Sequence, residues 1–184
     1  MTHPNQNIHA VLAASNFAAK KHSAQRRKGD AAEPYVNHVL ETAALVSGAM
    51  LEDDTNLVIA AILHDTLEDT ETTRHELEEK FGSDVASLVD ELTDNKALPK
   101  LERKRLQIVN ASKKSARAQM IKLADKISNL RSILASPPAD WDDRRKKEYF
   151  DWAAQVVGGL TAPNPILKGE FDGVVKAFAE TVQP

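Results

Sequence analysis

The sequence contains no cysteine, few glycines and few aromatic residues. Without cysteine the chain forms no disulfide, has no thiolate nucleophile and cannot build a cysteine-based zinc site, so any bound metal must use histidine and carboxylate ligands. The sequence also lacks an apolar run approaching the ~18 residues of a membrane span, and its N-terminus has no basic segment followed by an apolar run. We therefore expect a cytoplasmic protein that makes no membrane contact.

Helical patterns dominate what is present. The chain has only 7 glycines, no sustained alternation of Val, Ile and Tyr, and many Ala, Leu, Glu and Lys residues, which together indicate an all-α protein. A length of 184 residues suits one domain, residues 1–184. The spacing of apolar residues predicts a helical bundle of about eight to ten helices. The clearest cover 8–21, 35–50, 53–70, 72–81, 83–93, 100–110, 118–134 and 141–160, with a last helix after Asn164.

The overall charge is −3 and the pI about 6.1, which argues against a nucleic-acid partner. Composition gives no indication of the oligomeric state. One segment nevertheless gathers seven cations within 18 residues. It can be a solvated helical face partly neutralised by Glu102, or it can bind a phosphate-rich ligand. The seven are Lys100, Arg103, Lys104, Arg105, Lys113, Lys114 and Arg117.

Residues 60–70, AAILHDTLEDT, place four charged or ligating side chains on a helix that is otherwise apolar nearly all round. At about 100° per residue, Glu68 lies one turn beyond His64, and Asp69 lies one turn beyond Asp65. The four therefore share one sector of the helix predicted over 53–70. Since apolar residues occupy the remaining sectors, we expect this helix and its carboxylates to be buried.

Buried carboxylates repel one another and resist ionisation unless a cation lies among them. No lysine or arginine occurs between residues 51 and 71, so a divalent metal ion is the simplest source of positive charge. His64 and Asp65 would supply nitrogen and oxygen ligands, and the acidic pair one turn later could handle protons on a water molecule. Alternatively, the acids are solvated and His64 is an ordinary core histidine.

Two further residues, His38 and Asp125, could complete such a site. His38 lies near the start of a predicted helix, where it could also be a capping or surface residue. Asp125 lies beside the core face of the helix over 118–134, one turn before Asn129. It could equally pair with a neighbouring lysine, Lys122 or Lys126.

Packing predictions follow from the same spacing. We expect a narrow seam on the second helix and apolar anchors on the basic helix, and we expect His9 and His22 to lie on the surface. The seam consists of Leu40, Ala43, Ala44 and Ser47, and the anchors are Leu101, Leu106, Ile108 and Val109.

The order His38, His64-Asp65, Asp125 resembles the H…HD…D pattern of the HD superfamily of metal-dependent phosphohydrolases. Three segments, RRKGDAAEPYVNH, AAILHDTLEDT and KLADKISNLRSI, resemble the guanosine tetraphosphate hydrolase domain of RelA/SpoT proteins more specifically. With DNKALPKLERKRLQ and EYFDWAAQVV added, the chain is most similar to the small stand-alone alarmone hydrolases related to the metazoan SpoT homologue. The resemblance extends over about residues 8–175.

The resemblance implies a role for each of these residues. The metal would be one Mn²⁺, and Glu68 and Asp69 would be the catalytic acidic pair that positions a water and accepts its proton. The implied metal ligands are His38, His64, Asp65 and Asp125. The implied nucleotide-binding residues are Arg27, Lys28, Tyr35, Asn37, Lys100, Asn129 and Tyr149, whose cations, phenols and amides suit two diphosphates, a base and a ribose.

The implied reaction is hydrolysis of the 3′-diphosphate of (p)ppGpp to pyrophosphate and GDP or GTP, which lowers the alarmone of the stringent response. A second substrate is NADPH, which would lose its 2′-phosphate. A module that binds alarmones without catalysis would lack ligands or the acidic pair, all six of which are present here. A two-iron oxygenase needs extra histidines near the site. The remaining histidines are His3, His9, His22 and His75, and His75 lies beyond the helix predicted over 53–70, so a site for one metal ion fits the sequence better.

The chain departs from the family pattern at three positions. Val39 replaces the proline that usually follows the first metal histidine, and Gly29 and Ala31 replace residues that are commonly charged or proline. The last two could alter substrate contacts. Long RelA/SpoT proteins continue into a synthetase region, which these 184 residues do not include, so we expect no synthesis of the alarmone.

Overall fold

The computed structural model describes residues 4–181, and this part of the chain is helical throughout, apart from its connecting loops. It contains ten α-helices and one short 3-10 helix, η1. In chain order these are α1 (Pro4–Lys21), α2 (Val36–Ala49), α3 (Thr55–Leu63), α4 (Thr66–Asp69), α5 (Arg74–Phe81), α6 (Ser83–Leu92), α7 (Lys100–Asn110), η1 (Ala111–Lys113), α8 (Ala116–Ala135), α9 (Asp143–Gly158) and α10 (Pro165–Thr181). The predicted all-α class is confirmed.

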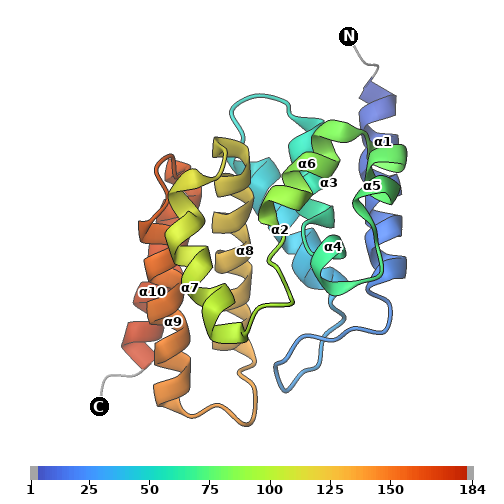
Figure 1. The fold of residues 1–184 in the computed structure, drawn as a ribbon. Helices are drawn as coiled ribbons and strands as arrows, with labels where there is room; N and C mark the ends of the chain where they lie inside the picture. The colour runs from blue at the N-terminus through green and yellow to red at the C-terminus, as the bar shows by residue number, and fades with distance from the viewer. Residues whose placement is uncertain (1–3, 182–184) are drawn as a thin grey trace.

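Helix α8 lies near the middle of the molecule (Figure 1). Helices α2 and α10 pack against it, and α3 packs against α2, α1 and α6. Eight consecutive residues of α8, numbers 121–128, are buried. A helix buried on every side brings even its polar residues into the interior, and this is how Asp125 comes to lie in the core.

The prediction of one continuous helix over 53–70 was wrong, because a turn at His64 and Asp65 separates α3 from α4. Two side chains there bond backbone carbonyls. His64 Nδ1 lies 2.8 Å from the oxygen of Ala61, and Thr66 Oγ1 donates to the oxygen of Leu63 at 2.6 Å. Such bonds compete with the helical ladder. The break keeps the HD pair at a turn between two helices.

The packing predictions were wrong in three places. The buried face of α2 carries Val39, Thr42, Ala43, Val46 and Ala49, so Ala43 of the predicted seam is buried, whereas its other members, Leu40, Ala44 and Ser47, are exposed. On α7 no residue is buried, and Leu101 is 81% exposed. His22, predicted to lie on the surface, is only 1% exposed.

No α-helix within residues 4–181 combines the length and the apolar character that crossing a membrane requires. His3, one of the spare histidines, lies outside the described residues.

Candidate active site

Three helical segments bring four predicted ligands together. His38 comes from α2, His64 and Asp65 from the turn after α3, and Asp125 from α8. One ligating atom each from His38, His64 and Asp65 lies within 4.8 Å of the others. Asp125 Oδ1 lies 3.3 Å from Nε2 of His38 and 3.8 Å from Nε2 of His64. The metal ligands implied by the sequence therefore converge, although they span 88 positions of the chain.

The imidazole of His64 presents the nitrogen that a metal needs. The carbonyl oxygen of Ala61 can only accept, so Nδ1 of His64 carries the proton of their 2.8 Å hydrogen bond. This assignment leaves Nε2 of His64 facing the carboxylates, and that buried atom has no hydrogen-bond partner among the described residues. Imidazole nitrogens with hard carboxylate oxygens suit Mn²⁺ among other divalent ions. The residues therefore fit a metal of this type.

The charges at this cluster also favour a cation. Burial alone would raise the pKa of Asp65, but the imidazoles of His64 and His38 hold it well below its usual range. Burial alone would lower the pKa of His64, yet Asp65 and Asp125 raise it to about 10. The carboxylates thus stay ionised and draw positive charge to the centre of the cluster. A divalent ion would supply that charge without a proton.

Neighbouring groups fix the two carboxylates. The hydroxyl of Tyr35 donates to Oδ2 of Asp65 at 2.7 Å, and burial together with Asp65 raises the pKa of this tyrosine, which keeps it a donor. Asp125 accepts a bond from Nδ2 of Asn129 at 2.6 Å and another from Nζ of Lys126 at 3.0 Å. The lysine pairing considered for Asp125 is therefore real, and it coexists with the contacts to both imidazoles.

The acidic pair Glu68 and Asp69 lies on α4, just beyond the HD pair. Each carboxylate contacts a cation that is distant in sequence: Arg103 Nη1 lies 3.2 Å from Glu68 Oε1, and Lys96 bonds Asp69. The backbone N–H of Asp94 also donates to Glu68 at 3.2 Å. Burial and the charge of Asp94 raise the pKa of Glu68. The cations missing from the local sequence are supplied by the segment around α7.

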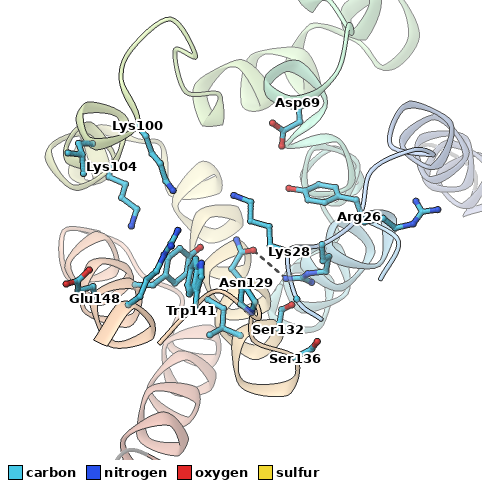
Figure 2. Close-up of a pocket in the computed structure, with 18 residues that line it drawn as sticks. Arg26, Lys28, Asp69, Lys100, Lys104, Asn129, Ser132, Ser136, Trp141 and Glu148 are labelled. Carbon is cyan, nitrogen blue, oxygen red and sulfur yellow. Dashed lines mark hydrogen bonds between the residues drawn. The ribbon is translucent and has the colours of Figure 1, made fainter. Parts of the chain in front are cut away.

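A cavity of about 490 Å³ adjoins the cluster (Figure 2). Tyr35 and Asn129, which bond Asp65 and Asp125, are part of its wall, as is Asp69. Figure 2 shows Lys100 and Lys104 on one side of the space and Lys28 on the other, and Trp141 is a further lining residue. A cavity with cations, aromatic rings and an acidic group beside this His-Asp cluster suits a phosphorylated aromatic ligand.

Six of the seven residues implied to bind nucleotide line this cavity, and Asn37 does not. The six are Arg27, Lys28, Tyr35, Lys100, Asn129 and Tyr149. Several of their polar groups already have partners in the protein. Arg27, for example, donates to the side chain of Asn129 at 3.4 Å, and Asn129 donates in turn to Asp125.

Other wall residues were not among those implied to bind nucleotide, although Lys104 belonged to the seven-cation segment. Lys104 lies 4.4 Å from the ring centroid of Trp152 and 5.1 Å from that of Tyr149, and the guanidinium of Arg145 lies 4.9 Å from that of Trp141. Burial and nearby cations lower the pKa of Lys104. The aromatic residues of 141–152 were a visible signal, but their pairing with α7 depends on tertiary packing.

The seven-cation segment does not form one surface. Lys100 and Lys104 line the cavity, whereas Arg103 pairs with Glu68. Arg105 pairs with Glu102, as the solvated-face interpretation predicted, and Arg117 pairs with acids of the α3–α6 region. The solvated-face interpretation therefore holds for Arg105, and phosphate binding by Lys100 and Lys104 stays a prediction that their place on the cavity wall allows.

Comparison with known proteins agrees with this geometry. A family model described as HD domain matches residues 14–151. The chain belongs to the HD domain family. The HD domain relatives include guanosine-3′,5′-bis(diphosphate) 3′-pyrophosphohydrolase MESH1 of Xenopus tropicalis, which is 49% identical over 162 residues that cover 88% of this chain and 90% of that protein. MESH1 of Homo sapiens is 49% identical over 172 residues, which cover 94% of this chain and 96% of that protein.

A solved structure shares the same HD domain fold. It is described as a metazoan ortholog of SpoT that hydrolyzes ppGpp and plays a role in starvation responses. It superposes with a TM-score of 0.88 at 42% sequence identity and covers 96% of this chain and 98% of its own. The resemblance inferred from the three sequence segments is confirmed.

Proposed function

We propose that this HD domain protein hydrolyses the 3′-diphosphate of guanosine tetraphosphate and pentaphosphate, with Mn²⁺ as cofactor, and releases pyrophosphate with GDP or GTP. One observation carries the proposal. The cationic and aromatic cavity meets the His-Asp cluster through Tyr35 and Asn129, each of which lines the cavity and bonds a cluster carboxylate. The names of the relatives, which share this chain over most of its length, support the choice of nucleotide.

His38, His64, Asp65 and Asp125 would hold the ion. A divalent cation in such a site lowers the pKa of water and offsets the negative charge of a phosphate group. Tyr35, Asn129 and Lys126 keep the two carboxylates oriented and ionised. The ligand set is therefore fixed before substrate arrives, as efficient catalysis requires.

Glu68 and Asp69 divide the handling of the attacking water. Asp69 is on the cavity wall, where it can accept a hydrogen bond from the water and orient it toward phosphorus. Glu68 precedes it on α4, and its raised pKa suits a group that must accept a proton. Arg103 and the N–H of Asp94 hold the Glu68 carboxylate in place.

Three lysines and two aromatic rings would bind the nucleotide. Lys28, Lys100 and Lys104 come from opposite walls of the cavity, so they can neutralise diphosphates at two positions of one ribose. Tyr149 and Trp141, with ring centroids 5.4 Å apart, offer apolar faces to a purine.

The test is hydrolysis of ppGpp by chain stripped of metal with a chelator, with and without added Mn²⁺. We expect GDP and pyrophosphate in equal amounts, formed only when Mn²⁺ is present. Release of orthophosphate from ppGpp, or absence of turnover with Mn²⁺ bound, would contradict the proposal. Parallel assays with Mg²⁺ and Zn²⁺ rank the metals.

NADPH is the second candidate substrate. Its 2′-phosphate is a phosphomonoester that the same acidic pair could hydrolyse, and its adenine could use the rings of Trp141 and Tyr149. Turnover of ppGpp and NADPH at equal concentration decides between them, and we expect ppGpp to be faster.

The cytoplasmic location of this protein stays a prediction.

A further inference from the structure

A serine hydroxyl lies directly behind the metal ligand His38. Ser128 Oγ is 2.9 Å from Nδ1 of His38 and 2.6 Å from Oε2 of Glu41. Ser128 has no exposed surface and His38 is 1% exposed, so water does not compete for these bonds. The three residues form a continuous hydrogen-bonded line from the cluster toward the protein surface, where Glu41 is partly exposed.

The direction of the protons along this line is determined by the groups themselves. An ionised carboxylate only accepts, so the single hydroxyl proton of Ser128 points to Glu41. The serine oxygen must then accept from His38, and Nδ1 of His38 carries a proton. The other ring nitrogen, Nε2, is left free on the side that faces Asp125 at 3.3 Å. This is the tautomer that a metal ligand needs.

Arg27, in the loop of residues 25–34, also bonds the hydroxyl of Ser128. Its Nη1 donates to Ser128 Oγ at 3.2 Å and its Nη2 donates to the backbone oxygen of Ser128 at 3.0 Å. With His38 and Arg27 as donors, both lone pairs of the hydroxyl are used. Nη1 of the same guanidinium also lies 3.8 Å from Oε2 of Glu41.

We propose that Ser128 and Glu41 are positioning residues that set the metal-binding tautomer of His38, and that Arg27 ties the loop of residues 25–34 to them. The inference rests on the metal site of the proposed function. In this arrangement Arg27 acts mainly inside the protein, and Lys28, Lys100 and Lys104 are left to neutralise phosphate. Outer groups that orient a histidine ligand typically contribute about 10- to 100-fold to metal affinity.

The first readout is the Nδ1–H proton of His38 in metal-free, ¹⁵N-histidine-labelled protein. In wild type we expect a protected signal, because the proton is buried and bonded. In Ser128→Ala we expect this signal to exchange rapidly. The Nδ1–H of His64, which donates to Ala61, should stay protected in both proteins and is the internal control. A His38 signal equally protected in Ser128→Ala would overturn the proposal.

The second readout is Mn²⁺ affinity, followed through the electron paramagnetic resonance of the free ion. Ser128→Ala should weaken binding by roughly 10- to 100-fold. Glu41→Gln should weaken it less, since an amide oxygen can still accept. The matched control is Thr42→Val on α2, since the Thr42 hydroxyl is buried and has no hydrogen-bond partner among the described residues.

The two readouts separate the failure of this inference from that of the proposed function. Unchanged Mn²⁺ affinity in Ser128→Ala, within twofold of Thr42→Val, would overturn the positioning role. Wild type that binds no Mn²⁺ while its His38 signal responds to Ser128→Ala would overturn the metal function and leave the hydrogen-bonded line in place.

Discussion

At the scale of single residues, Asp65 contacts both imidazoles of the cluster through one carboxylate oxygen. Its Oδ2 accepts from Tyr35 and lies 3.2 Å from Nε2 of His64 and 3.4 Å from Nε2 of His38. Replacing Asp65 with Asn keeps the shape but removes the charge. We expect Asp65→Asn to lose bound metal, measured by elemental analysis, and to lose ppGpp turnover. Asp151→Asn, a change at an exposed acid paired with Lys147, is the control, and a metal-loaded, active Asp65→Asn would remove Asp65 from the ligand set.

The acidic pair should be separable from metal binding. Neither Glu68 nor Asp69 has a cluster nitrogen as a partner, and each contacts a cation outside the cluster. We therefore expect Glu68→Ala with Asp69→Ala to retain bound metal while kcat falls by about 100-fold or more. The matched control is the exposed pair Glu78→Ala with Glu79→Ala on α5. Joint loss of metal and activity would instead make the pair ligands or structural residues.

The pH dependence of turnover should report on Glu68. A base must be deprotonated to accept a proton, so activity falls as the pH drops through the pKa of Glu68. Burial and Asp94 raise that pKa. Asp94→Asn removes one of these causes, so the acidic limb of kcat/KM should move to lower pH. Asp90→Asn, an exposed change on α6, should leave the limb in place, and an unmoved limb in Asp94→Asn would mean that Glu68 is not the titrating base.

At the scale of elements, the loop of residues 25–34 depends on one close approach. A Cβ on Gly29 would lie 2.1 Å from the backbone oxygen of Ser136, at the end of α8. Backbone atoms cannot yield as a flexible side chain can, so any larger residue must push the loop away. The glycine that departs from the family pattern is therefore explained by packing against α8.

Gly29→Ala tests this contact. We expect a loss of about 1–3 kcal/mol in unfolding free energy, and a fall in kcat/KM of roughly 10- to 100-fold as Arg27 and Lys28 are displaced. Chemical denaturation and ppGpp kinetics provide the two measurements. Gly169→Ala, in the exposed middle of α10 with no neighbour within 4 Å, should instead stabilise by about 0.5–1 kcal/mol. Equal behaviour of the two variants would refute the account of the loop.

Element boundaries were largely predictable, and element faces less so. The periodic spacing located α8 within two residues at its start and one at its end. The predicted seam on α2 did not include the buried residues Val39, Thr42 and Val46. Alanine and valine occur on several sides of this helix, so their spacing does not show which side is buried. The break between α3 and α4 depends on the side-chain bonds of His64 and Thr66, which no apolar period reveals.

At the scale of the whole molecule, the order of the motifs indicated which residues meet, and their roles stay predictions. His38, the His64-Asp65 pair and Asp125 could be selected from the sequence because ionisable residues on otherwise apolar helices indicate a functional site. Lys96 and Arg103 could not be assigned to the acidic pair, since they lie 27 and 35 positions away from their partners. The role of Ser128 could not be predicted from the sequence, because it depends on contacts with His38 and Glu41, which are distant along the chain.

The central claim is that residues of α2, the α3–α4 turn and α8 hold one cation. Equilibrium dialysis against Mn²⁺ followed by elemental analysis tests it, with wild type compared to Asp125→Asn, the ligand most distant along the chain. We expect one ion per wild-type chain and near-complete loss in Asp125→Asn, with the helical circular dichroism of the two proteins unchanged. A full complement of Mn²⁺ in Asp125→Asn, or none in wild type, would contradict it.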